Sequence, residues 1–462
     1  MEKPSLVYKA YKKAHLFFYS KINSSIQLLV FKSNNDNHYS TFSTDVTGYD
    51  NAPTFSIARI LTNTIPNIFT NETIDKIVKN EPLSKLEVKR DIEEIPNFKL
   101  WDMPTYMYWL AELSKNIIQY DNINEQVIYF YELPYIDLEK FNANLKSIDY
   151  YGTFEYISSS NYGKLNYSDE TQNLFDYLPF NKMVTHIEES EKIMKEDNSD
   201  VYIVLACKKK GKDQIGFFHF PALFTGLYRK NNEKWLYLVA SADPLPDETL
   251  LSRCKCLIIP GSELSVYEDF DFLRKTEVFL KQLIEDILFN GKYPQLKILG
   301  ICFGMEIVIS ALKGKIANLG KGKAQRFPEK IKLNNDFWNL QFVKNSKVPQ
   351  NELLTMCEAH GDYIDSFPDN YGLNIYGTSN SCKCEIMVDN KEKIFLIQGH
   401  PEYYPPFLVV RAADWYLSFL QREPTDENIK NYIVEFCEEE HNKNVNSKEW
   451  RQMCFTFMKK EC

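Results

Sequence analysis

Three residues in the C-terminal half of the chain have side chains that cooperate in nucleophilic catalysis: Cys302, His400 and Glu402. A cysteine attacks a carbonyl carbon as its thiolate, so it needs a base to remove the proton and a third group to orient that base. His400 and Glu402, separated by Pro401, can point to the same side of an extended segment. The pattern predicts acyl transfer through a thioester on Cys302. The alternative is a buried cysteine in an α/β core.

The residues around Cys302 predict a strand that turns sharply into a helix. An apolar run ends in Gly-Ile-Cys-Phe-Gly at 300–304, and apolar residues at helical spacing begin at Ile307. We expect the glycines to relieve a strained turn and to leave room for a substrate. We also expect the helix N-terminus to favour the thiolate of Cys302. A second apolar strand, at 395–397, precedes His400.

Four motifs in this order resemble the class I glutamine amidotransferase-like superfamily, and the resemblance covers about residues 200–462. They are Ile-Pro-Gly-Ser at 259–262, the turn at 300–304, Ala-His-Gly-Asp at 359–362 and Gln-Gly-His-Pro-Glu-Tyr at 398–403. The sequence of the last motif most resembles that of the plant γ-glutamyl peptidases, and so does the C-terminal segment around Trp450. The resemblance implies a doubly wound, mostly parallel α/β sheet, which the alternation of apolar strands and helical segments also predicts.

The resemblance also implies roles for individual residues. Cys302, His400 and Glu402 would form the catalytic triad, and no metal or cofactor would be required. The oxyanion and the substrate would be held by residues of the glycine loop, of the helix that follows the nucleophile and of the histidine loop. These residues are Gly261, Ser262, Phe303, Glu306 and His360. The amidotransferase turn usually continues Gly-His-Gln, whereas this chain has Met305 and Glu306 there. A glutamate at that position resembles the γ-glutamyl hydrolases and weakens the case for glutamine as the substrate.

Three hypotheses on function follow. The first is a cysteine hydrolase that cleaves a γ-glutamyl amide or peptide bond in a small, glutathione-like substrate or in glutamine. The second is a glutaminase module that supplies ammonia to a separate synthase. The third is a binding or scaffold protein that retains an ancestral triad while the N-terminal half carries the function.

Composition excludes several other classes. The chain has 462 residues, 44% of them apolar, and a net charge of −9, so no basic surface for nucleic acid is expected. No segment approaches the roughly 20 apolar residues of a membrane span, and the N-terminus does not resemble a signal peptide. All ten cysteines lie at or after Cys207, and we expect them to be reduced and buried. A cytoplasmic protein is therefore expected.

The sequence predicts an α+β domain at 1–160, an exposed helical linker at 161–199 and the amidotransferase-like domain at 200–462. The order of elements in the first domain is faintly similar to a Nudix-type domain. The Glu-rich helix that binds metal in that family is absent, so a domain of this kind would be inactive. The alternative is an unrelated α+β scaffold that binds a protein partner or forms a dimer.

The elements expected in the N-terminal half are strands at 25–31, 125–133 and 150–158 and helices at 53–61, 103–120, 137–145, 170–178 and 182–195. The segment 5–19 fits either a helix or a strand. In the C-terminal half, strands are expected at 201–206, 235–239 and 257–259, and helices at 268–289, 407–420, 428–436 and 448–458.

Overall fold

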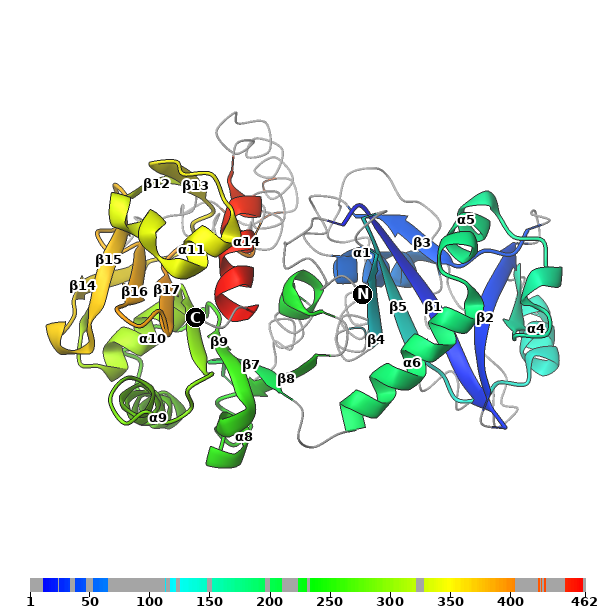
Figure 1. The fold of residues 1–462 in the computed structure, drawn as a ribbon, viewed down its shortest axis with the longest axis horizontal. Helices are drawn as coiled ribbons and strands as arrows, with labels where there is room; N and C mark the ends of the chain where they lie inside the picture. The colour runs from blue at the N-terminus through cyan, green and yellow to red at the C-terminus, as the bar shows by residue number, and fades with distance from the viewer. Residues whose placement is uncertain are drawn as a thin grey trace. The chain divides into compact units, whose positions relative to one another are not determined.

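The structure is a computed structural model in which the chain divides into two compact units (Figure 1). One unit comprises residues 9–197 and 229–232, and the other comprises residues 1–8, 198–228 and 233–462. The residues that the structure describes are 11–23, 25–33, 38–46, 53–64, 113, 117–121, 125–147, 152–195, 200–209, 223–230, 233–320, 328–403, 423, 425, 428 and 445–459. The predicted helices at 407–420 and 428–436 lie almost entirely outside these residues.

The N-terminal unit contains a mixed six-stranded sheet in the order β4-β5-β1-β2-β6, with β3 paired to β1. Its strands are β1 (Lys13–Ile22), β2 (Ser25–Ser33), β3 (Phe42–Asp45), β4 (Ile117–Asp121), β5 (Gln126–Glu132) and β6 (Gly152–Ile157). Its helices are α1 (Pro53–Thr64), α4 (Leu138–Ser147), α5 (Asp169–Tyr177) and α6 (Phe180–Lys195), with a short 3₁₀ turn η2 (Tyr162–Lys164). Strands β1 and β5 are parallel, and the other pairs are antiparallel.

Helices α5 and α6 pack on one face of this sheet. Phe17 on β1 stacks with Phe130 on β5 and contacts Phe175 on α5, and Met183 on α6 is buried in the same cluster. The sequence predicted that these two helices form an exposed linker. The structure differs because each helix has an apolar stripe, which the sheet buries, in addition to its charged face.

Two further differences concern strands. The segment 117–121, expected as the end of a helix, forms β4 and pairs with β5, while most of that predicted helix lies outside the described residues. The segment that fitted helix or strand is β1. The short strand β3 was not predicted, since four residues give too little alternation to be recognised.

The C-terminal unit is built on a nine-stranded sheet in the order β13-β12-β15-β16-β17-β10-β9-β7-β8. Its strands are β7 (Val201–Ala206), β8 (Lys234–Val239), β9 (Cys254–Ile259), β10 (Lys297–Ile301), β12 (Glu329–Leu333), β13 (Leu353–Met356), β15 (Leu373–Thr378), β16 (Ile386–Asp389) and β17 (Ile394–Ile397). A separate pair is formed by β11 (Lys315–Asn318) and β14 (Asp362–Ser366). The helices are α8 (Glu248–Arg253), α9 (Asp271–Leu288), α10 (Phe303–Ala311), α11 (Gln341–Ser346) and α14 (Ser447–Lys459), with 3₁₀ turns η3 (Asn335–Asn339) and η4 (Asp369–Tyr371).

The sheet is mixed rather than mostly parallel. The four neighbouring pairs from β17 to β8 are parallel, whereas the four pairs from β13 to β17 are antiparallel. The prediction missed the antiparallel half because its strands are only four to six residues long, which gives too short a pattern to be recognised. The doubly wound half, which contains the strands next to Cys302 and His400, is as expected.

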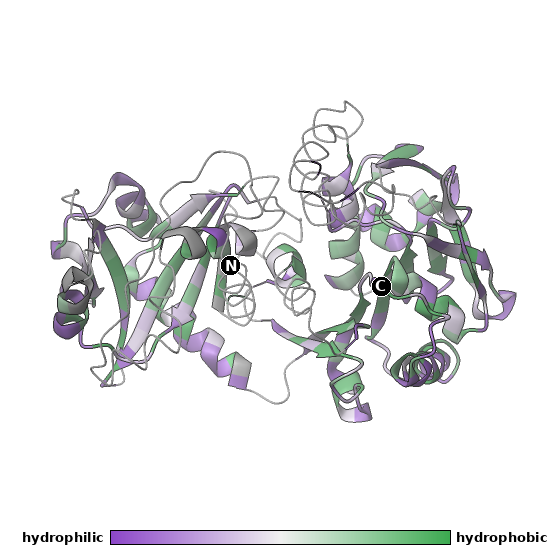
Figure 2. Ribbon diagram, turned by 180° about the vertical axis from the view of Figure 1, so that it is seen from behind, coloured by the Kyte–Doolittle hydropathy of each residue, from purple (hydrophilic) through white to green (hydrophobic). Residues whose placement is uncertain are grey.

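Helices cover both faces of this sheet, as the alternation along β17 illustrates. Leu396 belongs to the apolar cluster shared with α9 and α10, whereas Phe395 packs against Phe342 of α11 and Phe457 of α14. The buried Lys297 donates to the carbonyl of Phe457 at 2.8 Å, near the C-terminus of α14, where a cation is favoured. The strands of both sheets are largely apolar, while the helices also carry polar residues (Figure 2).

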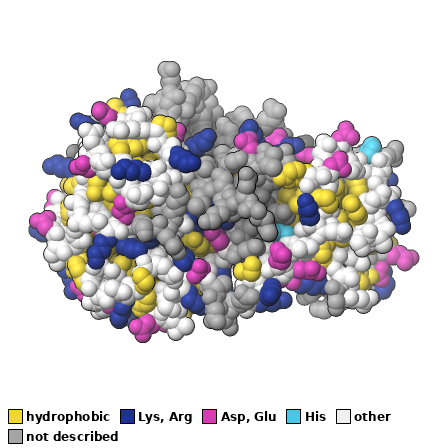
Figure 3. All heavy atoms as spheres, in the orientation of Figure 1, with side chains coloured by type: hydrophobic (Ala, Val, Ile, Leu, Met, Phe, Trp, Pro, Cys, Tyr) yellow, Lys and Arg dark blue, Asp and Glu magenta, His cyan; other side chains and the backbone are white. Residues whose placement is uncertain are grey.

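Surface and cysteine properties can be compared with the expectations from composition. On the face drawn in Figure 3, acidic and basic side chains are interspersed over the described parts of each unit. None of the helices in the described parts of the chain combines the length and the apolar character needed to cross a bilayer. The eight described cysteines are free and buried, as predicted.

Candidate active site

Cys302 lies at the turn between β10 and α10, in a strained backbone conformation. Its φ is 52° and its ψ is −114°, a region that residues with a side chain rarely adopt. The turn is held because the Cys302 N–H donates to the carbonyl of Ile397 on β17 at 2.7 Å. The Cys302 carbonyl then accepts from the N–H of Met305 at 2.9 Å, which starts the helix. The predicted sharp strand-to-helix turn is therefore present.

The glycines on either side of Cys302 are required by packing. A Cβ atom on Gly304 would lie 1.9 Å from the backbone oxygen of Ile259 on β9, and one on Gly300 would lie 2.8 Å from the Gly304 oxygen. The strained torsion belongs to Cys302 itself. The glycines thus bring α10 close to β9, a reason different from the turn strain that the sequence analysis assigned to them.

His400 and Glu402 form a buried hydrogen-bonded pair at the end of β17. His400 Nδ1 and Glu402 Oε1 are 2.7 Å apart, and the two residues are 5% and 0% exposed. A carboxylate only accepts, so Nδ1 carries the proton and Nε2 presents a lone pair. The ring also stacks on Tyr403, with centroids 4.9 Å apart. This is the orientation that a general base requires.

The segment that carries Glu402 is fixed by α14. The guanidinium of Arg451, which is 1% exposed, donates to the carbonyl of Glu402 at 2.6 Å and to that of Pro401 at 3.3 Å. Ser447 donates to the carbonyl of Tyr403 at 3.0 Å. These supporting residues were not predicted from the sequence. The signal in the sequence that could have indicated them is an arginine among the apolar residues of α14.

Gly261 brings the three segments together, because β9, β10 and β17 are neighbours and end at the same edge of the sheet. A Cβ atom on Gly261 would lie 2.9 Å from His400 Cε1 and 3.6 Å from Cys302 Cβ. The hydroxyl of the next residue, Ser262, donates to the carbonyl of Cys207 at 2.6 Å, which ties this loop to the end of β7. The backbone N–H of Phe303, at the start of α10, acts on the sulfur of Cys302 in the direction that lowers the pKa of the thiol.

The pKa of the Cys302 thiol is raised well above its usual value, which contradicts the expected stabilisation of the thiolate. Burial is the main cause, and the charges of Glu306, Glu402 and Glu358 add to it, while the Phe303 hydrogen bond acts in the opposite direction. The thiol also donates weakly to the carbonyl of Ala359, at 3.9 Å. Apolar burial and nearby carboxylates outweigh the helix dipole here. The resting group is therefore a thiol.

Glu306 lies on α10 below the turn and is 3% exposed. Its Oε1 accepts from Gln398 Nε2 at 3.0 Å. Burial, reinforced by the charge of Asp362, raises the pKa of Glu306 to about 8. The carboxyl group is therefore largely protonated, and neutral, at pH 7.

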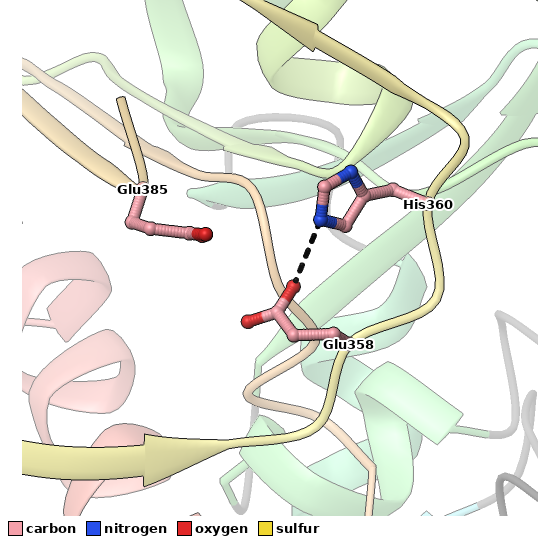
Figure 4. Close-up of side chains that lie close together, drawn as sticks. All are labelled: Glu358, His360 and Glu385. Carbon is pink, nitrogen blue, oxygen red and sulfur yellow. Dashed lines mark ion pairs between the residues drawn. The ribbon is translucent and has the colours of Figure 1, made fainter. Parts of the chain in front are cut away.

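His360 lies on the loop between β13 and β14 and is 3% exposed. Its Nδ1 donates to the carbonyl of Asp362 at 2.8 Å. Burial lowers the pKa of His360 to about 4, so the ring is neutral. The ring faces Glu358 (Figure 4), a relationship that the sequence analysis did not predict.

Comparison with known proteins identifies the class to which this part of the chain is related. Residues 252–406 match the family model of "Glutamine amidotransferase class-I". This match includes the Gly261 loop, the Cys302 turn and the His400–Glu402 segment, so the resemblance inferred from the motifs is confirmed for this part of the chain.

Individual relatives are distant. "Gamma-glutamyl peptidase 4" of Arabidopsis thaliana is 26% identical over 258 residues, which is 54% of this chain and 90% of that protein. "GMP synthase [glutamine-hydrolyzing]" of Streptococcus pyogenes is 27% identical over 150 residues, which is 32% of this chain and 24% of that protein. A solved structure of a glutamine amidotransferase from Thermotoga maritima is 18% identical, with a TM-score of 0.39, over 56% of this chain and 99% of its own.

Proposed function

We propose that the protein is a cysteine hydrolase that cleaves a γ-glutamyl amide or peptide bond through a γ-glutamyl thioester on Cys302. The observation that carries the proposal is the buried His400–Glu402 pair, at 2.7 Å, beside a cysteine held at a positive φ. The similarity to a γ-glutamyl peptidase over 90% of that relative's length supports the same bond type.

In the proposed reaction, Nε2 of His400 takes the thiol proton as the sulfur attacks the γ-carbonyl carbon. Glu402 holds the ring and stabilises the imidazolium through Nδ1. Because the thiol pKa is raised, proton transfer and attack are coupled, and the resting protein holds little free thiolate. The developing oxyanion would be received by N–H groups of the Gly261–Ser262 loop and of Phe303, each worth about 3–4 kcal/mol of barrier.

The second half of the reaction regenerates the thiol. Protonated His400 gives its proton to the leaving amine, the C–N bond breaks and the γ-glutamyl group remains on sulfur. His400 then takes a proton from water, the resulting hydroxide attacks the thioester, and the proton returns to the departing sulfur of Cys302. The products are the amine and a free γ-carboxylate, and the thiol of Cys302 is restored.

The relation to a GMP synthase and to the amidotransferase family supports a second candidate, hydrolysis of glutamine for ammonia transfer. Glu306 is the residue that separates the two. Glu306 stands where the amidotransferases that this chain resembles carry a glutamine. The carboxyl group of Glu306 is nevertheless neutral below about pH 8. Cleavage of γ-glutamyl peptides therefore remains the preferred proposal.

The test is mass spectrometry of the full-length protein incubated with glutathione, a γ-glutamyl dipeptide or glutamine, with Cys302→Ala in parallel. We expect glutamate release from γ-glutamyl peptides and a transient mass increase of one γ-glutamyl group on Cys302, both lost in the variant. Release from glutamine alone would favour the ammonia-supplying module. Absence of both glutamate and the acyl-enzyme would overturn the hydrolase proposal.

A further inference from the structure

Three ionisable side chains converge in the interior beside the site described above (Figure 4). Glu358 and His360 come from the loop between β13 and β14, and Glu385 immediately precedes β16. One ligand atom of each lies within 4.8 Å of the others. The three residues are 0%, 3% and 0% exposed, respectively. Figure 4 shows all three side chains directed toward the same space.

The orientation of the His360 ring is that of a metal ligand. Because Nδ1 donates to the carbonyl of Asp362 at 2.8 Å, Nδ1 carries the proton and Nε2 presents a lone pair. That lone pair faces Glu358 Oε2 at 3.5 Å. Two acceptors that face each other do not form a hydrogen bond, so this contact needs either a proton on Glu358 or a cation between the two groups. A backbone carbonyl that fixes the tautomer is the usual outer partner of a histidine ligand.

The two glutamates have the same need. Both oxygens of Glu358, Oε2 of Glu385 and Nε2 of His360 lack a hydrogen-bond partner among the described residues. Within the same part of the chain, neither glutamate forms an ion pair with a lysine or an arginine. Burial, reinforced by the charges of Glu385, Glu329 and Glu402, raises the pKa of Glu358 well above its usual value. Burial also raises the pKa of Glu385 to about 8, with the charge of Glu329 adding to it and the hydrogen bond from Ser379 acting in the opposite direction. Buried carboxylates in this state are costly unless protons or a cation compensate them.

We propose that Glu358, His360 and Glu385 bind a divalent transition-metal ion, zinc or manganese. A neutral imidazole and two carboxylates are ligands that both ions accept. Metal–ligand bonds of about 2.0–2.2 Å with tetrahedral angles place ligand atoms roughly 3.4 Å apart, which the 3.5 Å between His360 and Glu358 already matches. The ion would replace the protons that the carboxylates otherwise retain.

Because the cluster lies next to the segment that carries His400, an ion bound there would help to position that segment. A Cβ atom on Gly399 would lie 2.3 Å from Glu358 Oε1, so the carboxylate abuts the residue before His400. The carbonyl of Cys357 accepts from the His400 N–H at 2.7 Å. An ion here would therefore hold the 357–360 loop against the 398–400 segment and would take no part in bond cleavage. The inference does not depend on the proposed hydrolysis.

The test uses full-length protein that has been treated with a chelator and dialysed. Titration with ZnCl₂ or MnCl₂, followed by calorimetry and thermal melting, should give one equivalent bound and a raised Tm. Cobalt(II) should give visible d–d absorption without a thiolate-to-cobalt charge-transfer band, because the cluster contains no cysteine. Glu385→Gln and His360→Gln should each weaken binding more than about 100-fold, since they remove a ligand rather than an outer partner.

Two variants serve as matched controls. Glu329→Gln removes a nearby carboxylate whose Oε1 already accepts from the backbone N–H groups of Asn380 and Ser381 and whose Oε2 accepts from the Ser381 hydroxyl. Cys302→Ala removes the thiol, which is the other side chain in the candidate active site that could bind these metals. Both should bind the ions as the wild type does. Failure of the wild type to bind any of the three ions, or unchanged binding by Glu385→Gln, would overturn the proposal. Loss of binding in Cys302→Ala would also overturn it, by placing the ion at the thiol.

Discussion

The side chain of Gln398 donates a hydrogen bond to the carboxyl group of Glu306 at 3.0 Å, between the end of β17 and the first turn of α10. The same carboxyl group is a source of negative charge that raises the pKa of Cys302. Because the pKa of Glu306 is itself raised to about 8, the charge next to the thiol is absent in acid and appears in mild alkali.

Glu306→Gln should therefore change how stability depends on pH. The folded protein holds the Glu306 proton up to about pH 8, whereas the ordinary value is 4.5. The folded state consequently binds more protons than the unfolded state across this window, and wild-type stability declines as the pH rises through it. Glutamine has no such dependence, so the variant should gain on the order of 3 kcal/mol relative to wild type between pH 5 and pH 8.5.

Urea unfolding of both proteins at pH 5, 6.5 and 8.5 measures this difference directly. Glu358 and Glu385 also have raised pKa values, but they are present in both proteins and cancel in the comparison. A stability difference that is the same at all three pH values would contradict the assignment of a proton to Glu306.

The close approach of α10 to β9 predicts a large effect of Gly304→Ala. The added methyl group would lie 1.9 Å from the backbone oxygen of Ile259, and backbone cannot move aside as a side chain can. We expect a loss of at least about 3 kcal/mol of unfolding free energy. Gly163→Ala is the matched control, since nothing lies within 4 Å of the added atom, and it should cost less than about 0.5 kcal/mol. Denaturant titration of both variants checks this, and similar values for the two would refute the packing argument.

The sequence was informative where local pattern and chemistry coincide. The apolar strand before Cys302 and the glycines on either side of it specify a sharp turn. This turn was predictable because the residues that define it are adjacent in the sequence. The same holds for the strand that ends at His400. The thiol pKa was not predictable in this way, because it depends on burial and on Glu306, Glu402 and Glu358, which only the tertiary structure brings near the sulfur.

The remaining features of the site depend on contacts between distant segments. Arg451 reaches the carbonyl of Glu402 across 49 positions of sequence, and Glu385, immediately before β16, lies close to His360. Neither arrangement has a spacing signature. In the N-terminal unit, the charged face of α6 suggested an exposed helix, whereas Met183 and Ile187 on the opposite face are fully buried against the sheet.

The His400–Glu402 pair predicts the effect of Glu402→Gln. The amide could still reach Nδ1, but its NH₂ group would favour the tautomer in which Nε2 carries the proton, so the lone pair needed to deprotonate Cys302 would be lost. In triads with an aspartate, the corresponding change lowers kcat by about 10⁴, and we expect a decrease of about 10³–10⁴ with KM little changed. Steady-state kinetics on a γ-glutamyl peptide, with a thermal melt to establish folding, makes the measurement. A folded variant with wild-type kcat would exclude Glu402 from the mechanism.

Arg451 should act on catalysis through position rather than contact with substrate. Arg451→Met keeps much of the side-chain volume but leaves the carbonyls of Pro401 and Glu402 without the donor that holds them. We expect a loss of about 2–4 kcal/mol of unfolding free energy and a fall in kcat, because the carboxylate of Glu402 would no longer be held against His400 at 2.7 Å.

The matched control for this change is Arg253→Met at the end of α8. Nε and Nη1 of Arg253 have no hydrogen-bond partner among the described residues, so the variant should lose less than about 1 kcal/mol and retain full activity. Denaturant unfolding and separate measurement of kcat and KM distinguish the two effects of Arg451→Met. A merely structural role would lower stability and leave kcat of the folded protein unchanged, whereas a looser His400–Glu402 pair would lower kcat with KM little changed. A variant with wild-type stability and wild-type kcat would show that α14 does not hold the catalytic segment.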